Sequence, residues 1–112
     1  MHSRGAGLDL VFHALADSTR RAMLAALSRG ERTAGELGEP FRISQPAASK
    51  HIRVLENAGL VKGSAAGRHR RYRLNPRPLD DAQAWIQKQR RFWEGTLSQL
   101  NTLLAGLKKK HH

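Results

Sequence analysis

Apolar residues recur every three or four positions over most of the chain, which predicts a mainly helical protein. Leu8, Val11 and Leu15 are spaced for a short first amphipathic helix. Asp17 is a candidate N-cap for a second helix, STRRAMLAAL, which Gly30 ends. The predicted apolar stripe of this second helix is Ala22, Met23, Ala26 and Leu27.

A third, shorter helix is predicted over AGELGEPF. Thr33 precedes it as a candidate N-cap, and Leu37 and Phe41 lie four residues apart, so both face inward. Pro40 disfavours helical geometry in the residue before it, and this helix should therefore end within about two turns.

The stretch ISQPAASKHIRVLENAGLV predicts an amphipathic helix over about residues 44–58. The hydroxyl of Ser44 is placed to accept a hydrogen bond from a backbone N–H of the first turn, where Pro46 costs no hydrogen bond. The apolar face comprises Ala48, Ile52 and Leu55. The opposite face comprises Gln45, Pro46, Ser49, Lys50 and Arg53. The outer face is therefore basic and rich in hydrogen-bonding groups.

Residues 61–74 predict a β-hairpin made of VKGSA and HRRYRL, joined around Ala66 and Gly67. Tyr72 and Leu74 alternate inward, and Arg71 and Arg73 point outward. The tip of this hairpin is rich in arginine.

The pattern is helical again over about residues 79–107, a length of roughly 40 Å. Its apolar seam has a seven-residue repeat, Leu79, Ile86, Trp93, Leu100 and Leu107, with Leu97 and Leu104 at intermediate positions. A small domain does not need so long a seam for its own core, which indicates a partner, most simply a second copy of the chain. Gly95 inside the helix costs about 1 kcal/mol relative to Ala and leaves a kink or a break open.

The length of 112 residues suits one domain, expected over residues 1–107, with a flexible basic tail, KKKHH, at 108–112. The net charge is +11, and residues 43–78 contain eight basic side chains and one acidic one. This balance favours a polyanionic partner, either nucleic acid or an anionic membrane surface.

No apolar stretch approaches the roughly 18 residues needed to span a bilayer, and the N-terminus lacks a signal-peptide pattern. The absence of cysteine excludes disulfides, thiolate metal sites and cysteine nucleophiles. We therefore expect a cytoplasmic protein without a membrane partner.

The predicted order of elements, three helices, a basic-faced helix, a basic hairpin and a long helix, matches a winged helix-turn-helix, a mostly α fold with a small β-hairpin. Double-stranded DNA is then the expected partner. Gln45, Ser49 and Arg53 would read base edges in the major groove. The expected phosphate contacts are Lys50, Arg68, Arg70 and Arg71.

Three segments, ALADSTRRAMLAAL, TAGELGEPFRISQPAASKHIRVLENAGLV and GRHRRYRLNP, together resemble the ArsR-type winged helix-turn-helix transcriptional repressors over nearly all of residues 8–107. The resemblance implies a homodimer built on the first and last helices, repression by occupying an operator, and release by a signal that the sequence does not reveal. The implied dimer interface is Leu8, Val11, Ile86, Trp93, Leu97, Leu100 and Leu104. The implied DNA surface is Ser44, Gln45, Pro46, Ser49, Lys50, His51, Arg53, Lys62, Arg68, Arg70 and Arg71.

The chain departs from the metal-sensing members of that family. The stretch that corresponds to their cysteine motif is ELGEPF, without cysteine. Their other site takes Asp, His and Glu from paired last helices, and here Asp80 and Asp81 open that helix but no histidine follows before His111 and His112. The likeness is closer to the metal-free subgroup, through Arg90–Trp93, so we expect no metal and no cofactor.

Several features have two readings. Ser44 can cap its helix or read a base, and His51 can be a structural imidazole or a phosphate contact. Arg68 and Arg70 can bind DNA or be merely solvated. The aromatic residues Trp85, Phe92 and Trp93 can line a small-molecule pocket or an interface.

A serine, a lysine and a histidine lie close together in the basic-faced helix, but no acid is placed to orient the imidazole, so we expect no enzyme. The alternative function is a non-specific architectural or RNA-binding protein that uses the same basic surface. A winged helix that mainly binds protein through its last helix is a third possibility.

Overall fold

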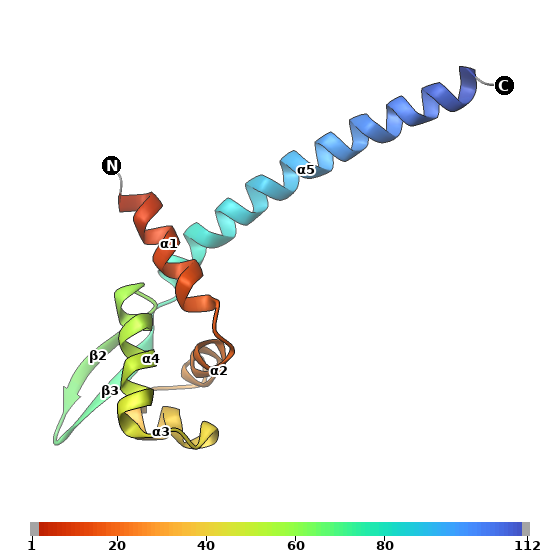
Figure 1. Ribbon diagram of the computed structural model, residues 1–112. Helices are drawn as coiled ribbons and strands as arrows, with labels where there is room; N and C mark the ends of the chain where they lie inside the picture. The colour runs from red at the N-terminus through yellow and green to blue at the C-terminus, as the bar shows by residue number, and fades with distance from the viewer. Residues whose placement is uncertain (1–2, 111–112) are drawn as a thin grey trace. The chain divides into compact units, whose positions relative to one another are not determined.

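The computed structural model describes residues 3–110, which form helices and one small antiparallel sheet (Figure 1). The chain divides into two compact units, Met1–Ala82 and Gln83–His112. The first unit holds the sheet and the helices before it, and the second consists of the greater part of the last helix. The predicted fold class, mostly α with a small β-hairpin, is confirmed.

Four α-helices precede the hairpin: α1 (Ser3–Leu15), α2 (Ser18–Leu27), α3 (Ala34–Gly38) and α4 (Gln45–Asn57). The three predicted N-caps are confirmed, because the side chains of Asp17, Thr33 and Ser44 each accept from a backbone N–H in the first turn of their helix. Thr33 forms a reciprocal capping box with Glu36.

The ends of α1 and α3 differ from the prediction. Helix α1 begins at Ser3, before the apolar positions from which it was predicted. The sequence did not predict this start, because SRGAG carries no periodic apolar signal. Helix α3 ends at Gly38 and continues as a 3₁₀ turn, Glu39–Phe41, around Pro40. Arg42 follows with φ of 54°, in the left-handed region, and turns the chain toward α4.

Three strands form the sheet, in the order β1-β3-β2: β1 (Arg32–Thr33), β2 (Val61–Ala66) and β3 (His69–Leu74). The predicted hairpin is confirmed, and Ala66 pairs with His69, which leaves a two-residue turn at Gly67 and Arg68. Gly67 has a φ of +63°, which glycine adopts without a steric penalty. Strand β1 was not predicted, since two residues are too short to show alternation.

The core of the first unit is one apolar cluster. Its fully buried members include Met23, Leu37, Ile52, Leu55 and Leu60. The predicted apolar face of α4 is confirmed, and so is the burial of Leu37 in α3. Phe41, predicted to face inward from the same helix, belongs to the 3₁₀ turn and is only partly buried against the core. In α2, however, Ala22 is exposed and Leu24 is buried in its place, because burying leucine removes more apolar surface from water than burying alanine.

The predicted dimer contacts of α1 lie mainly in the core of their own chain. Val11 is 2% exposed, so it leaves almost no surface for a second copy. Leu8 is half-buried and packs against the same core. The large apolar side chain that α1 presents to solvent is Leu10, which is 43% exposed.

The last helix, α5 (Arg77–Lys110), is continuous through Gly95, so neither a break nor a second helix occurs there. It continues through Lys110, beyond its predicted end, whereas His111 and His112 lie outside the described residues. In the second unit the seam is exposed: Ile86, Trp93, Leu97, Leu100, Leu104 and Leu107 are 44–57% accessible. No helix among residues 3–110 is both long and apolar enough to cross a bilayer.

Candidate nucleic-acid interface

The outer face of α4 carries the residues expected to read DNA. Gln45, Ser49 and Arg53 are exposed, as are Pro46 and Lys50 beside them. They have this position because Ala48, Ile52 and Leu55 bury the opposite face in the core. Ser44 caps the helix: its hydroxyl accepts from the N–H of Ala47 at 3.2 Å. Ser44 therefore acts as the N-cap of α4 in this structure.

Helix α3 packs closely under α4 because Gly38 has no side chain. A Cβ built on Gly38 would lie 2.8 Å from the Cβ of Ala48, which is closer than two non-bonded carbon atoms approach. Both residues are buried, so the contact can hardly widen without moving a helix. The small pair therefore sets the distance between the two helices of the helix-turn-helix and leaves the outer face of α4 free.

A groove of about 400 Å³ runs between α4 and the hairpin. It is lined by Thr33, Ala34, Gly35, Gln45, Ser49, Arg68, His69, Arg70 and Tyr72. Residues from the start of α3, the outer face of α4 and strand β3 thus meet at one polar, basic surface. The sequence predicted the contributions of α4 and the hairpin to this surface, but the contribution of residues 33–35 had no periodic signal.

The basic residues of the hairpin are divided between its two faces. Arg70 shares a face with Tyr72 and lines the groove, whereas Arg71 and Lys62 lie on the other face. On that face the Nε of Arg71 lies 3.8 Å from Oε1 of Glu31, and both side chains are about half exposed. Exposed pairs of this kind stabilise a protein by only about 0–1 kcal/mol, so Arg71 can exchange Glu31 for another anion at little cost.

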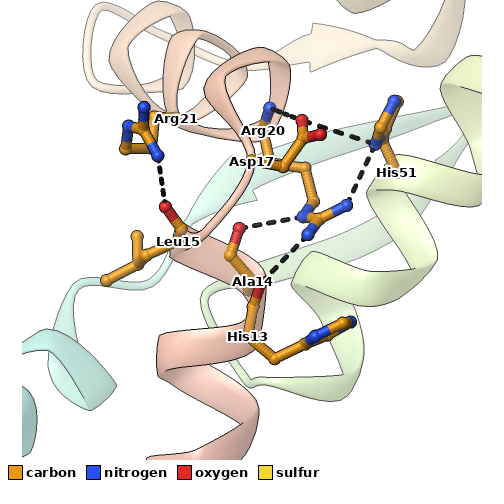
Figure 2. A network of polar contacts seen from close by, with 7 residues as sticks. All are labelled: His13, Ala14, Leu15, Asp17, Arg20, Arg21 and His51. Carbon is orange, nitrogen blue, oxygen red and sulfur yellow. Dashed lines mark hydrogen bonds and ion pairs between the residues drawn. The ribbon is translucent and has the colours of Figure 1, made fainter.

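His51 faces the corner between α1 and α2, as Figure 2 shows. Its Nδ1 lies 3.3 Å from Nη1 of Arg20 and 3.9 Å from Oδ2 of Asp17. Arg20 has only donors, so in this contact the Nδ1 of a neutral imidazole is the acceptor. His51 is two residues from both Ser49 and Arg53, which is a rotation of about 200° around the helix axis. The imidazole and the reading residues therefore lie on opposite sides of α4.

Arg20 is a structural residue that the sequence did not reveal. Its Nε donates to the carbonyl of Ala14 at 2.8 Å, and its Nη2 donates to the carbonyl of His13 at 2.9 Å (Figure 2). These carbonyls belong to the last turn of α1, where carbonyls lack the i+4 partner of the helix interior, and the carbonyl of His13 also accepts from the N–H of Ala16 at 3.2 Å. Spacing along one helix cannot predict a side chain that joins three helices.

Two carboxylates at helix starts are held ionised. The backbone N–H of Arg20 lowers the pKa of Asp17, and the Arg20 guanidinium and His51 act in the same direction. The backbone N–H of Thr33 lowers the pKa of Glu36, with a further contribution from the Thr33 hydroxyl. The resulting negative charges lie at the N-termini of α2 and α3, where they stabilise the helix dipoles.

The close serine, lysine and histidine do not form a catalytic arrangement. Ser44 caps α4, Ser49 and Lys50 face outward, and His51 faces Arg20. Among residues 3–110 no three histidine, aspartate or glutamate side chains come together as a metal site, and this includes Asp80 and Asp81.

A second cavity, of about 510 Å³, lies in the first unit. It is lined by Gly7, Leu8, Val11, Ala58, Gly59, Asn75, Arg77, Pro78, Asp80 and Asp81. The aromatic residues that had suggested a small-molecule pocket, Trp85, Phe92 and Trp93, line neither cavity. Trp85 is 44% exposed, and the other two are more exposed than that.

Helices α2, α3 and α4, followed by a hairpin whose basic residues border α4, define a winged helix-turn-helix protein. Comparison with known proteins agrees, since a helix-turn-helix domain model matches residues 15–63. The HTH-type transcriptional regulator Rv2034 of Mycobacterium tuberculosis is 39% identical over 90 residues, which cover 80% of this chain and 81% of that protein. The transcriptional repressor SdpR of Bacillus subtilis is 38% identical, over 70% of this chain and 88% of that protein.

A crystal structure of an ArsR family transcriptional regulator superposes with a TM-score of 0.76 at 40% identity, over 80% of this chain and 93% of that one. The chain belongs to the ArsR family of helix-turn-helix transcriptional regulators. It is accordingly a DNA-binding transcriptional regulator, as the resemblance of its motifs implied.

Proposed function

We propose that this protein is a homodimeric repressor that binds an inverted-repeat DNA operator and reads it with α4. The observation that carries the proposal is the groove in which Gln45 and Ser49 of α4 lie beside Arg68 and Arg70 of the hairpin. Short polar side chains next to guanidinium groups suit close approach to base edges flanked by phosphates.

The roles divide according to position. Gln45, Ser49 and Arg53 supply donors and acceptors to base edges, while Lys50, Arg68, Arg70 and Arg71 hold phosphates. The contribution of Ser44 and Pro46 is to start α4 at the correct residue, and a phosphate contact can accompany the cap. Lys62, on the outer face of the hairpin, adds positive charge to the surface that DNA approaches. His51 supports α4 from the side away from the groove.

The dimer is supported by α5. Its exposed seam comprises Ile86, Trp93, Leu97, Leu100 and Leu104, which is more apolar surface than a soluble helix ordinarily leaves in water. A solution structure of a homodimeric winged helix-turn-helix domain from Mycobacterium bovis has a TM-score of 0.61 at 26% identity, over 75% of this chain and 76% of that one. A two-fold dimer of this kind presents its two recognition helices about 34 Å apart, to half-sites one helical turn apart.

Repression, as opposed to activation, is supported by relatives that are named repressors, SdpR among them. A repressor acts by occupying DNA that the transcription machinery needs, so the protein requires no catalytic group of its own. We place it in the cytoplasm, where bacterial relatives meet their DNA.

Selection of bound sequences from random duplex DNA tests the proposal. We expect an inverted repeat to be enriched, and to bind at physiological salt about 10³-fold more tightly than random duplex. A ratio near one would instead favour the alternative of a non-specific architectural or RNA-binding protein. Sedimentation at micromolar concentration tests the dimer, and a stable monomer would contradict it.

A further inference from the structure

We infer that Gly63 and Tyr72 form a slot that holds the guanidinium of Arg70 against the hairpin, so that Arg70 is presented ready-oriented to the DNA backbone beside α4. Gly63 and Tyr72 are positioning residues in this inference, and Arg70 is the residue that touches DNA. The inference rests on the proposed DNA-binding function of the groove and adds to it the means by which one contact is oriented.

The register of the hairpin brings the three residues together. Gly63 of β2 pairs with Tyr72 of β3, so both project to the same face of the sheet. Arg70 lies two residues before Tyr72 on β3 and therefore shares that face. Its side chain extends diagonally across the hairpin toward β2, over the position where any other residue at 63 would have a side chain.

The distances show how closely Arg70 occupies this space. A Cβ built on Gly63 would lie 2.7 Å from Nη2 and 3.1 Å from Nε of Arg70, and 2.9 Å from Cε1 of Tyr72. The guanidinium carbon lies 6.0 Å from the centre of the Tyr72 ring, at the outer limit of a cation–π contact. The absence of a side chain at Gly63 is therefore what allows the guanidinium to lie along the strand beside the ring.

Arg70 also differs from its neighbour in its electrostatic surroundings. Arg71 shares its charge with Glu31 on the opposite face, whereas within residues 3–110 no acidic side chain lies at ion-pair distance from Arg70. The charge of Arg70 faces a groove that it shares with Gln45 and Ser49. An oriented arginine without a counter-charge, next to the reading face of α4, is suited to bind a phosphate.

Holding the side chain in place matters because a free arginine loses rotamer freedom when it binds. A slot that restricts these rotamers beforehand reduces that loss and strengthens binding without adding a contact. Gly63→Ala should displace the guanidinium, because the end of a long side chain moves more easily than the backbone. We therefore expect the fold to survive the substitution while the contact with DNA is lost.

A double-mutant cycle on DNA binding tests the inference with Gly63→Ala, Arg70→Ala and the double variant. Arg70→Ala should weaken binding about 5- to 10-fold and reduce the salt slope by about one unit. Gly63→Ala alone should reproduce most of that loss, and the double variant should be no weaker than Arg70→Ala. A full, independent loss from Gly63→Ala in the Arg70→Ala background, or no loss from Gly63→Ala alone, would overturn the inference.

Two further measurements keep the result interpretable. Tyr72→Leu keeps an apolar side chain but removes the ring, and should also weaken binding only while Arg70 is present. Ser64→Ala, on the opposite face of β2, is the matched control and should leave binding unchanged, with thermal unfolding checking that each variant is folded. If the wild-type chain did not bind DNA at all, the proposed function itself would fail, whereas failure of the slot leaves wild-type binding intact.

Discussion

The guanidinium of Arg20 lies 3.3 Å from Nδ1 of His51, and the same group donates to two carbonyls at the end of α1. One side chain of α2 thus connects the last turn of α1 to the recognition helix α4 (Figure 2). The recognition helix is therefore positioned by contacts on the side that faces away from the groove, and substitutions there should alter binding without removing a contact to DNA.

Arg20→Ala should lower the free energy of unfolding by about 1–3 kcal/mol, because the contacts of one guanidinium with two helix-end carbonyls and an imidazole are lost together. Urea unfolding measures the change. Arg21→Ala is a suitable control, since within residues 3–110 the Arg21 guanidinium donates only to the carbonyl of Leu15, at an exposed site. Equal losses in the two variants would show that the connection made by Arg20 contributes nothing of its own.

His51→Ala should leave the salt dependence of DNA binding unchanged, because the imidazole faces Arg20 and does not face the groove. Lys50→Ala, one residue earlier on the outer face, should reduce the salt slope by about one unit. Titrations at several salt concentrations distinguish the two variants. A reduced slope for His51→Ala would assign a phosphate contact to this residue after all.

Arg53→Ala should relax discrimination at one base position by about 1–3 kcal/mol, whereas Arg71→Ala should weaken specific and random DNA alike. Glu31→Gln provides the complement, because it frees Arg71 from its ion pair and should strengthen binding to both DNAs slightly. Competition assays with operator and random duplex measure all three. The same sequence-independent loss for Arg53→Ala and Arg71→Ala would refute the division between reading and holding residues.

Gly38→Ala should destabilise the protein by about 1–3 kcal/mol, because the new methyl group would overlap Ala48 in a buried contact. Gly95→Ala should have the opposite effect and stabilise α5 by about 0.5–1 kcal/mol, since a Cβ there meets no atom within 4 Å and alanine favours the helix. Thermal unfolding of both variants tests these two expectations. The prediction would be contradicted if both substitutions raised the stability or both lowered it.

Acid should destabilise the protein through Asp17 and Glu36. Their folded-state pKa values lie below the ordinary values of 3.8 and 4.5, because backbone N–H groups bind the ionised forms. The stabilisation is therefore complete above these ordinary values and is lost as the pH falls through the lowered folded-state pKa values. Urea unfolding over this pH range should show a flatter pH dependence for Asp17→Asn with Glu36→Gln, and an unchanged one would refute the assignment.

The sequence by itself determined the local structure of the interface. The caps at Asp17, Thr33 and Ser44 and the apolar periodicity of α4 are local signals, and they predicted both the helices and the residues left outside. The alternation of β3 likewise predicted that Tyr72 and Leu74 face inward. These features were predictable because backbone geometry relates residues only a few positions apart.

Tertiary structure decided which residues meet across elements. It assigned Val11 to its own core, added β1 to the sheet and brought residues 33–35 to the groove. It also gave His51 a partner on α2 and placed Glu31 beside Arg71. Such contacts depend on how helices and strands pack, and a period along one element contains no information about the element packed against it.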